Sequence, residues 1–355
     1  MSSIFWITKR TGNPSHTMKV WLPYTQGGSG SDVFTHTLAD GLTTAGHEAI
    51  EQAFKHHWQY VPWALKSVTP PSRTDCIIAN TWNGFAFHRP PVPLITVEHL
   101  FVLDPALRSY RSFAQAIFHE TLVRHFEKAS MRASDVQVAV SEYTANAHHR
   151  VLHGSRPQVI INGIDTDFFT PPPAGHDRLG NRPVRLLFVG NLTRRKGVDL
   201  IAPIMRELGA GFDLDYTVGL RTTAGLAAIP NARVLGRLDQ LSIREAYRRA
   251  DLLLFPTRLE GLGLVAIEAM ACATPVVATR TSALPEVIDD GVTGRLCSQD
   301  DPAAFASAIR ELAAQPDALV RMGHAARQAA VARFSIRRMV DEYVTLLRFA
   351  HGAAG

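Results

Sequence analysis

Cysteine is scarce in this chain, and its distribution excludes two kinds of stabilised domain. The 355 residues include three cysteines, Cys76, Cys272 and Cys297, which lie far apart and form no CxxC pair. A disulfide framework and a cysteine-ligated zinc site are therefore not expected. This usage is typical of a reducing compartment, so we expect the protein in the cytoplasm.

Long hydrophobic runs are also missing. The stretch that comes nearest, residues 261–279, contains Glu268 at its middle and Pro275 near its end, which favours short buried elements over a membrane span. Residues 1–17 hold only a short apolar run ahead of Lys9 and Arg10. They do not fit a signal peptide, and we interpret them as a leader before the first strand.

Lysine is scarce as well. The chain has 6 lysines against 31 arginines, and Lys196 is the only lysine in its second half. Lys196 follows Arg194 and Arg195, in a loop between an expected strand at 184–189 and a helix that begins at Gly197. A strand, a basic loop and a helix can bind phosphate, and a compact ammonium in an arginine-rich chain indicates a dedicated site. A solvated surface charge is the alternative interpretation.

The composition is otherwise that of a globular protein. Hydrophobic residues make up 46% of the chain, and the formal net charge of +5 is mild, so no nucleic-acid partner is expected. The length allows two α/β domains.

Strand-like and helix-like segments alternate along the chain, which predicts parallel sheets. In the first half we expect strands at 19–22, 75–79, 93–97, 136–140 and 159–161, and helices at 32–45, 109–131 and 143–152. Residues 170–183 are rich in proline and glycine and predict a linker. The second half repeats the alternation from 184 to about 334, and an amphipathic helix at 337–349 ends the chain.

The most informative segment is 255–291, where two carboxylates eight residues apart frame a glycine turn that opens a helix. Gly261 and Gly263 allow backbone N–H groups to approach a ligand, and the helix N-terminus favours an anion. Glu268 lies in that helix among apolar neighbours, so it needs dedicated donors. Sugar or ribose hydroxyls could supply them, and backbone amides are the structural alternative. With Glu260 at the turn, the segment indicates a sugar nucleotide.

Two other interpretations of these patterns are weaker. Gly261, Gly263 and Ala266 match a relaxed dinucleotide-binding pattern, but five residues separate the glycines from the strand, where that motif needs a tight turn. The two DxD triplets, at 165–167 and 213–215, are interpreted as coincidence. No His/Asp/Glu cluster has metal-ligand spacing in the sequence, so no metal or other cofactor is expected.

Several motifs in this order resemble those of the GT-B glycosyltransferases of glycosyltransferase family 4, over about residues 18–349. They are the paired glutamates Glu260 and Glu268, the phosphate-binding segments 188–190 and 196–199, the crossover at 159–165, the tail segments 284–286 and 290–294, and the glycine loop at Gly27 and Gly28. The resemblance implies a retaining enzyme with two facing Rossmann-like domains, each with a parallel sheet, and a cleft between them. It places an acceptor-side domain at 1–165, a nucleotide-sugar domain at 166–336, and the helix at 337–349 back on the first domain.

The resemblance also implies roles for individual residues. Glu260 contacts the donor sugar, Glu268 the ribose, and Lys196 with Arg194 or Arg195 the diphosphate. Further donor contacts are implied for the turn and the glycine loop, at Gly27, Gly28, Gly261, Leu262, Gly263 and Leu264. No protein nucleophile is needed, because a donor phosphate oxygen accepts the acceptor's proton.

The chain departs from the family pattern at two positions. Asn191 stands where the family commonly has arginine. Glu98, two residues after Thr96, stands where the family has an active-site histidine, and His99 follows one residue later. Adjacent strand residues face opposite ways, so we expect His99 to enter the cleft only if the strand ends at Val97. We predict Glu260, Lys196 and His99 as catalytic residues.

The acceptor is the least constrained part of the prediction. Residues 109–132 interleave aromatic and basic side chains, a pattern that can dock on an anionic membrane or be buried in a core. We expect transfer from a UDP-, GDP-, ADP- or TDP-sugar to a glycan or lipid-linked acceptor, in surface polysaccharide or glycolipid synthesis. The alternatives are a phosphorylase, a sugar-phosphate transferase or a catalytically silent nucleotide-binding scaffold.

Overall fold

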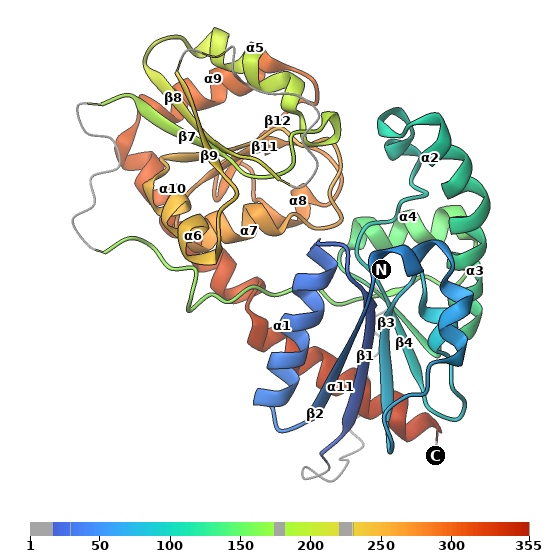
Figure 1. Cartoon of the computed structure of the whole chain (residues 1–355). Coiled ribbons are helices and arrows are strands. Elements are labelled where there is room, and N and C mark those ends of the chain that lie inside the picture. The colour runs from blue at the N-terminus through green and yellow to red at the C-terminus, as the bar shows by residue number, and fades with distance from the viewer. Residues whose placement is uncertain (1–16, 29, 174–181, 220–228, 230, 355) are drawn as a thin grey trace, which may run out of the picture.

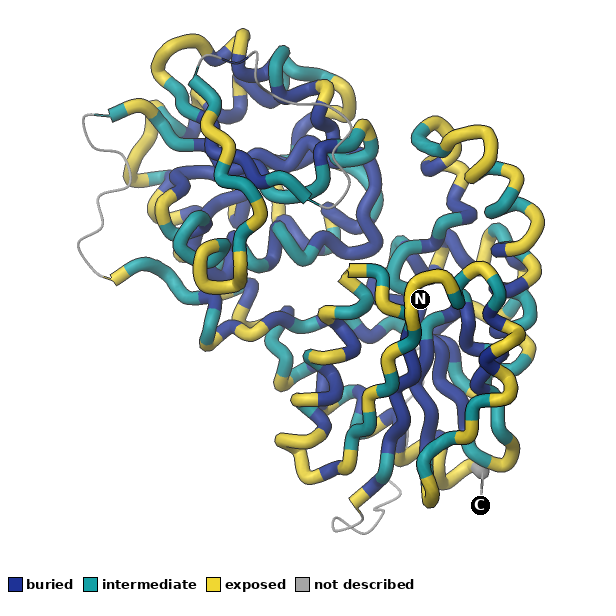
Figure 2. The backbone as a smooth tube through the Cα atoms, in the orientation of Figure 1, coloured by how far each residue is buried: buried dark blue, intermediate teal, exposed yellow. Residues whose placement is uncertain are grey.

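The computed structural model describes residues 17–28, 30–173, 182–219, 229 and 231–354. These residues form two halves, each built on a six-stranded parallel sheet with helices on its faces (Figure 1). The inner strands of each sheet lie at the centre of their half and are deeply buried (Figure 2). The expected pair of parallel α/β sheets is confirmed. No described helix is both long enough and apolar enough to cross a bilayer.

The sheet of the first half has the order β2-β1-β3-β4-β5-β6. Its strands are β1 (Lys19–Thr25), β2 (Glu48–Phe54), β3 (Cys76–Asn80), β4 (Leu94–Glu98), β5 (Val136–Ala139) and β6 (Gln158–Val159). Its longer helices are α1 (Gly30–Thr44), α3 (Arg124–Ala133) and α4 (Glu142–Leu152). Alternate strand residues face opposite layers: Val20 and Leu22 pack in the core with α1, whereas Trp21 packs with Phe87 on the other face.

The sheet of the second half has the order β12-β11-β10-β7-β8-β9. Its strands are β7 (Val184–Phe188), β8 (Phe212–Thr217), β9 (Ala232–Gly236), β10 (Leu252–Phe255), β11 (Val276–Thr279) and β12 (Gly294–Cys297). Its helices are α5 (Val198–Leu208), α6 (Gln240–Arg249), α7 (Leu264–Ala271), α8 (Leu284–Val287), α9 (Pro302–Ala313) and α10 (Pro316–Arg333). β10 and β11 are buried along their whole length, as short apolar runs with parallel neighbours on both sides should be.

The chain crosses between the halves twice, and the two crossings touch. The Ile164 N–H donates to the Phe334 carbonyl at 2.8 Å, and the Ile336 N–H donates to the Ile164 carbonyl at 3.0 Å. A Cβ at Gly163 would overlap the Ser335 carbonyl oxygen, so glycine permits the contact. Beyond it, α11 (Ile336–Ala354) runs back and packs against α1 of the first half (Figure 1).

Two points of the sequence analysis need correction. β2 was not expected, because its residues are a mixture of polar and small side chains that suits a half-exposed edge strand. The helix expected at 109–131 begins later, at Phe113, after a separate 3₁₀ turn η4 (Pro105–Tyr110), and it runs from α2 (Phe113–Phe118) through a π turn η5 (His119–Val123) into α3. Ser112 and Gln115 form a capping box that starts α2. Residues 1–16 of the expected leader and 174–181 of the expected linker lie outside the described residues.

Candidate active site

A basic loop joins β7 to α5, as the sequence predicts. Gly190 and Gly197 have φ angles of +146° and +74°, which L side chains rarely adopt. Between them, a 3₁₀ turn η6 (Arg194–Lys196) leads into α5 at Val198. A Cβ at Gly197 would overlap the Pro256 carbonyl oxygen, so the loop packs directly on the end of β10.

Lys196 and Glu260 form a largely buried ion pair, with side chains 12% and 11% exposed. The Lys196 Nζ lies 2.6 Å from the Glu260 Oε1 and 5.5 Å from the centre of the Phe255 ring. The Thr257 hydroxyl donates to the same oxygen at 2.7 Å, and the Arg195 Nη1 lies 3.8 Å from it. Burial raises the pKa of Glu260, but Lys196 and Arg195 outweigh it and hold this pKa below its ordinary value. Glu260 is therefore ionised at neutral pH.

The two arginines beside Lys196 have different surroundings. Arg195 donates to the Leu259 carbonyl at 2.6 Å, which ties it to the Glu260 turn. The Arg194 side chain is 74% exposed and lies 3.9 Å from Asp199. Arg194 can therefore turn toward a ligand without breaking a buried contact.

The glycine turn after β10 is in direct contact with the first half. Gly263, with a φ of +102°, precedes α7. A Cβ at Gly261 would overlap the His99 carbonyl oxygen, so only glycine allows this approach. The Ser141 and Thr144 hydroxyls, at the start of α4, donate to the Gly261 carbonyl at 2.6 and 3.1 Å. The first half thus fixes the orientation of the peptide group that begins with the Gly261 carbonyl. The backbone amides of residues 262–264, which come next, are those predicted to bind the diphosphate.

A second contact between the halves joins α8 to α4. The Glu286 carboxylate accepts hydrogen bonds from the backbone N–H groups of Glu142 and Tyr143, at 2.8 and 2.7 Å. Amides in the first turn of a helix have no carbonyl partner within the helix, and the positive end of the α4 dipole favours a carboxylate there. Sequence analysis missed Ser141, Thr144 and Glu286 as partners, because each pairs with residues more than 100 positions away.

Glu268 lies on α7 and lines a cavity of about 260 Å³ between the halves, together with Phe34, Asn162 and Phe168. The Tyr247 hydroxyl donates to its Oε2 at 2.8 Å. Burial raises the pKa of Glu268 to about 7, and the Tyr247 hydrogen bond opposes the rise. The sequence analysis expects a dedicated hydrogen-bond donor for the Glu268 carboxylate, and in the structure this donor is the Tyr247 hydroxyl.

His99 and Glu98 point to opposite sides of the first half. The His99 ring packs edge to face on Phe34, with centroids 4.6 Å apart, and burial lowers the pKa of His99 to about 4. Glu98 accepts a hydrogen bond from the Thr81 hydroxyl at 3.0 Å, and burial raises its pKa to about 7. The strand ends at Glu98 rather than Val97, and His99 lies on the α1 side and beside Gly261.

The backbone amides of the glycine loop in the first half are bound by the Asp32 side chain, which lies in the first turn of α1. The Gly27 and Gly28 N–H groups donate to the Asp32 Oδ2 at 2.9 and 2.8 Å. The carboxylate holds the place where the sequence predicts a phosphate, so Asp32 must release these amides before they can bind a donor.

Arg258 is a site residue that the sequence analysis did not single out. It is buried and donates to Asp199 at 2.7 and 2.9 Å and to Asp300 at 2.6 Å. Its guanidinium also lies over the Tyr110 ring of the first half, 5.8 Å from the centroid. Arg258 therefore links the Glu260 turn to the start of α5 and to the opposite half.

Both DxD triplets have structural partners. The Asp165 Oδ1 accepts the N–H groups of Asp167 and Phe168 in a turn, and Asp215 pairs with Arg233 at 2.7 Å. The fold does, however, assemble a cluster that the sequence spacing could not reveal. Among the described residues, one group of three carboxylate and imidazole side chains lies close enough to hold a metal, and it consists of Glu98, Glu127 and His148.

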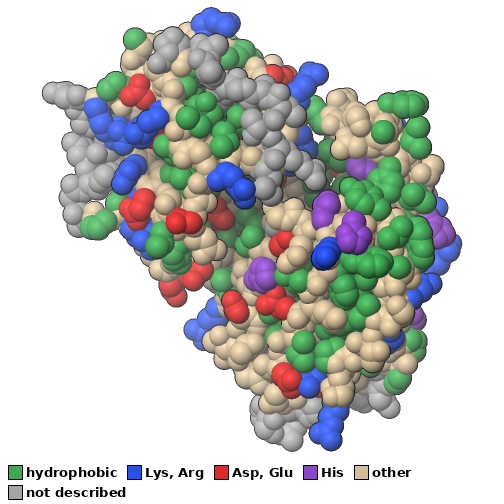
Figure 3. Space-filling view, in the orientation of Figure 1, with side chains coloured by type: hydrophobic (Ala, Val, Ile, Leu, Met, Phe, Trp, Pro, Cys, Tyr) green, Lys and Arg blue, Asp and Glu red, His purple; other side chains and the backbone are tan. Residues whose placement is uncertain are grey.

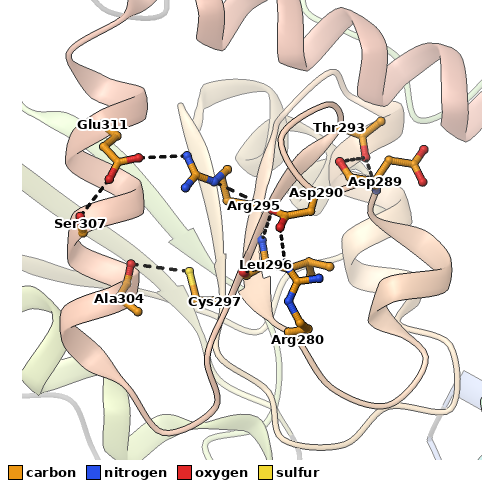
Figure 4. A network of polar contacts seen from close by, with 10 residues as sticks. All are labelled: Arg280, Asp289, Asp290, Thr293, Arg295, Leu296, Cys297, Ala304, Ser307 and Glu311. Atoms are coloured by element: carbon orange, nitrogen blue, oxygen red, sulfur yellow. Dashed lines mark hydrogen bonds and ion pairs between the residues drawn. The ribbon is translucent and has the colours of Figure 1, made fainter.

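The tail segment 290–294 has a structural role (Figure 4). The Asp290 carboxylate accepts the Leu296 N–H at 2.9 Å and pairs with Arg280. Gly291 has a φ of +79°, and a Cβ at Gly294 would overlap the Val276 carbonyl oxygen. The two glycines thus allow β12 to join the sheet beside β11.

The aromatic and basic segment 109–132 is partly exposed and partly core. The apolar side chains on its outer part are 83% exposed at Phe113, 51% at Ile117 and 42% at Leu122, whereas Phe126 is buried. Tyr60 and Trp63, in the preceding turns η1 (His56–Tyr60) and η2 (Pro62–Ser67), are about half exposed. Hydrophobic side chains are spread over much of the face of the first half seen in Figure 3. The Arg111 side chain is buried and pairs with Glu120, so it is not a surface cation.

Comparison with known proteins identifies both halves. Residues 50–168 match the family described as Glycosyltransferase Family 4, and residues 183–315 match the family described as Glycosyl transferases group 1. The alpha-maltose-1-phosphate synthase of Mycobacterium tuberculosis is 33% identical over 254 residues, which cover 62% of this chain and 65% of that protein. The chain belongs to glycosyltransferase family 4. It spans slightly less than two thirds of this relative's length.

Solved structures confirm the GT-B fold of this family 4 chain. Sucrose-phosphate synthase from Thermosynechococcus elongatus superposes with a TM-score of 0.82 at 19% identity, covering 95% of this chain and 100% of that one. Anabaena HepE in complex with UDP and glucose superposes with a TM-score of 0.73 at 17% identity, covering 93% and 99%.

Proposed function

We propose that the protein is a retaining glycosyltransferase that moves a sugar from a nucleoside-diphosphate sugar to a glycan or lipid-linked acceptor. The observation that carries this proposal is the buried Lys196 and Glu260 pair, 2.6 Å apart, at the junction of the basic loop and the glycine turn. The pair unites one group suited to phosphate with one suited to sugar hydroxyls. Anabaena HepE, which shares the fold, is known in complex with UDP and glucose and with UDP-glucose, and this supports a nucleotide-sugar donor.

The leaving diphosphate is stabilised by preoriented donors. As the glycosidic bond breaks, negative charge grows on the diphosphate, and the Lys196 ammonium, the Arg194 guanidinium and the amides at 262–264 stabilise it. These groups act without a metal ion. Glu260 holds a sugar hydroxyl, and Glu268 accepts the ribose hydroxyls in the cavity that it lines. A donor phosphate oxygen accepts the acceptor's proton on the same face, which retains the anomeric configuration.

The exposed apolar surface of the first half supports a lipid-linked acceptor. Phe113, Ile117, Leu122, Tyr60 and Trp63 present large apolar side chains to solvent. Such a surface fits the interfacial region of a bilayer. We therefore place the protein at the cytoplasmic face of the membrane, in surface polysaccharide or glycolipid synthesis.

Donor turnover tests this function. The four classes of donor are incubated with the protein, and release of nucleoside diphosphate is measured for wild type, Lys196→Ala and Arg348→Ala, a control at an exposed basic residue of α11. We expect one donor class to be turned over, and only Lys196→Ala to lose activity. Proton NMR of the transferred sugar should show the donor's anomeric configuration. An inverted product, or binding without release of nucleoside diphosphate by wild type, contradicts the proposal.

A further inference from the structure

Three elements of the first half bring two carboxylates and an imidazole together in its interior. Glu98 ends β4, Glu127 lies in α3 and His148 lies in α4. Their exposed fractions are 3%, 3% and 1%, and their ligand atoms all lie within 4.8 Å of one another. Among the residues that the structure describes, no ion pair includes any of the three, so no neighbouring cation offsets the two carboxyl groups.

Hydrogen bonds within the protein leave this cluster incomplete. The Thr81 hydroxyl lies 3.0 Å from the Glu98 Oε2 and 3.2 Å from the Glu127 Oε1. The Glu127 Oε2 and the His148 Nδ1 are buried and have no hydrogen-bond partner. A proton shared by the two carboxyl groups would balance one charge but leave both of these atoms unpaired. Each unpaired buried atom destabilises the folded state, because it has lost its bonds to water and gained none in the protein.

We propose that Glu98, Glu127 and His148 bind a divalent transition-metal ion, Zn²⁺ or Mn²⁺. Two carboxylate oxygens and one imidazole nitrogen are a ligand set that these ions accept, whereas Mg²⁺ and Ca²⁺ prefer oxygen ligands. The ligand atoms must close to about 3.3 Å, the edge of a tetrahedron with 2.0 Å bonds. The Thr81 hydroxyl lies beside the carboxylates and can complete the shell or hold a water.

The ion would tie α3 to two elements that reach the other half. β4 leads into His99, whose carbonyl lies against Gly261, and α4 begins with the hydroxyls that bond to Gly261. The site is separate from the Lys196 and Glu260 pair, so it does not depend on the proposed function and leaves the donor chemistry free of metal.

Metal binding by the purified full chain tests the proposal. After treatment with EDTA and dialysis, the protein receives Zn²⁺, Mn²⁺ or Mg²⁺ alone, and bound metal and melting temperature are measured. We expect Zn²⁺ or Mn²⁺ to bind at one ion per chain and to raise the melting temperature, and Mg²⁺ to do neither. Glu127→Gln and His148→Asn should bind the ion at least roughly tenfold more weakly.

The neighbouring histidine supplies a matched control. His149 is exposed and its Nδ1 contacts the Gly154 carbonyl, so His149→Asn should bind the metal as wild type does. A second measurement needs only the wild type and therefore remains valid if the cluster variants do not fold. Co²⁺ bound at the cluster should absorb visible light, and Zn²⁺ should remove this absorption by displacing the Co²⁺. The proposal would be overturned if wild type bound neither Zn²⁺ nor Mn²⁺, or if His148→Asn bound the metal as tightly as wild type. Glu98 and Glu127 would then share a proton instead of binding a metal ion.

Discussion

The ionisation of Glu268 should control the affinity for the nucleotide. An ionised carboxylate accepts ribose hydroxyls more strongly than a neutral carboxyl group does. With a pKa of about 7, Glu268 is roughly one-tenth ionised at pH 6 and nine-tenths ionised at pH 8. The affinity of wild type for the bare nucleoside diphosphate should therefore rise by up to about tenfold over this range. Calorimetry at pH 6, 7 and 8 measures this dependence.

Two variants separate the carboxylate from other sources of pH dependence. Glu268→Gln keeps the shape but cannot ionise, so it should lose the part of the pH dependence that belongs to this group. The nucleotide's own phosphate titration remains in both proteins, which makes the difference between them the informative quantity. Glu268→Ala should weaken binding by roughly 1.5–3 kcal/mol at pH 8. Glu260→Ala should leave nucleotide affinity near normal and reduce turnover.

The same pKa shift makes a prediction about stability. The folded pKa of Glu268, about 7, is raised above its ordinary value of 4.5, so the folded state binds the proton more tightly than the unfolded state. This contribution to stability is fully present below pH 4.5 and is lost as the pH rises through 7. Glu268→Gln should therefore gain stability relative to wild type between pH 4.5 and 8, by at most about 3 kcal/mol. Equal pH slopes for the two proteins, in both binding and stability, would refute the assignment.

Three further predictions concern other parts of the site. Lys196→Ala should lower kcat by about two orders of magnitude in a steady-state assay, because one preoriented donor to the leaving group is lost; an unchanged kcat would exclude this role. Ser141→Ala with Thr144→Val should lower kcat by up to about thirtyfold, since the Gly261 carbonyl loses two hydrogen bonds of about 1 kcal/mol each; normal turnover would show that the contact is not needed. Wild type should sediment with phosphatidylglycerol vesicles and Phe113→Ser should do so less, and wild type that stays in the supernatant would exclude membrane docking.

The local part of the site could be predicted from the sequence because its residues are close together along the chain. The basic loop at Lys196 and the glycine turn at Gly263 each follow an apolar strand and open a helix. A parallel sheet then places both at its carboxyl edge. The Lys196 to Glu260 contact follows from β7 and β10 being neighbours.

The remaining contacts depend on how the two halves meet, which sequence spacing does not encode. From the sequence, Ser141 is an ordinary helix cap and Glu286 a charged residue in a short helix. Only the folded structure shows that each forms a hydrogen bond to the other half. The Glu98 cluster likewise joins β4, α3 and α4, and only the packed structure brings its side chains together. β2 was missed because an edge strand that is half exposed carries little apolar alternation.

The central claim is that the Lys196 and Glu268 region binds a nucleoside-diphosphate sugar, and thermal shift with UDP-, GDP-, ADP- and TDP-sugars tests it most directly. A ligand at 100 times its Kd stabilises the folded state by about 2.7 kcal/mol. We expect one nucleotide class to raise the melting temperature of wild type and to have a much smaller effect on Glu268→Ala. A melting temperature that no donor changes, or a shift that Glu268→Ala retains in full, would contradict the account.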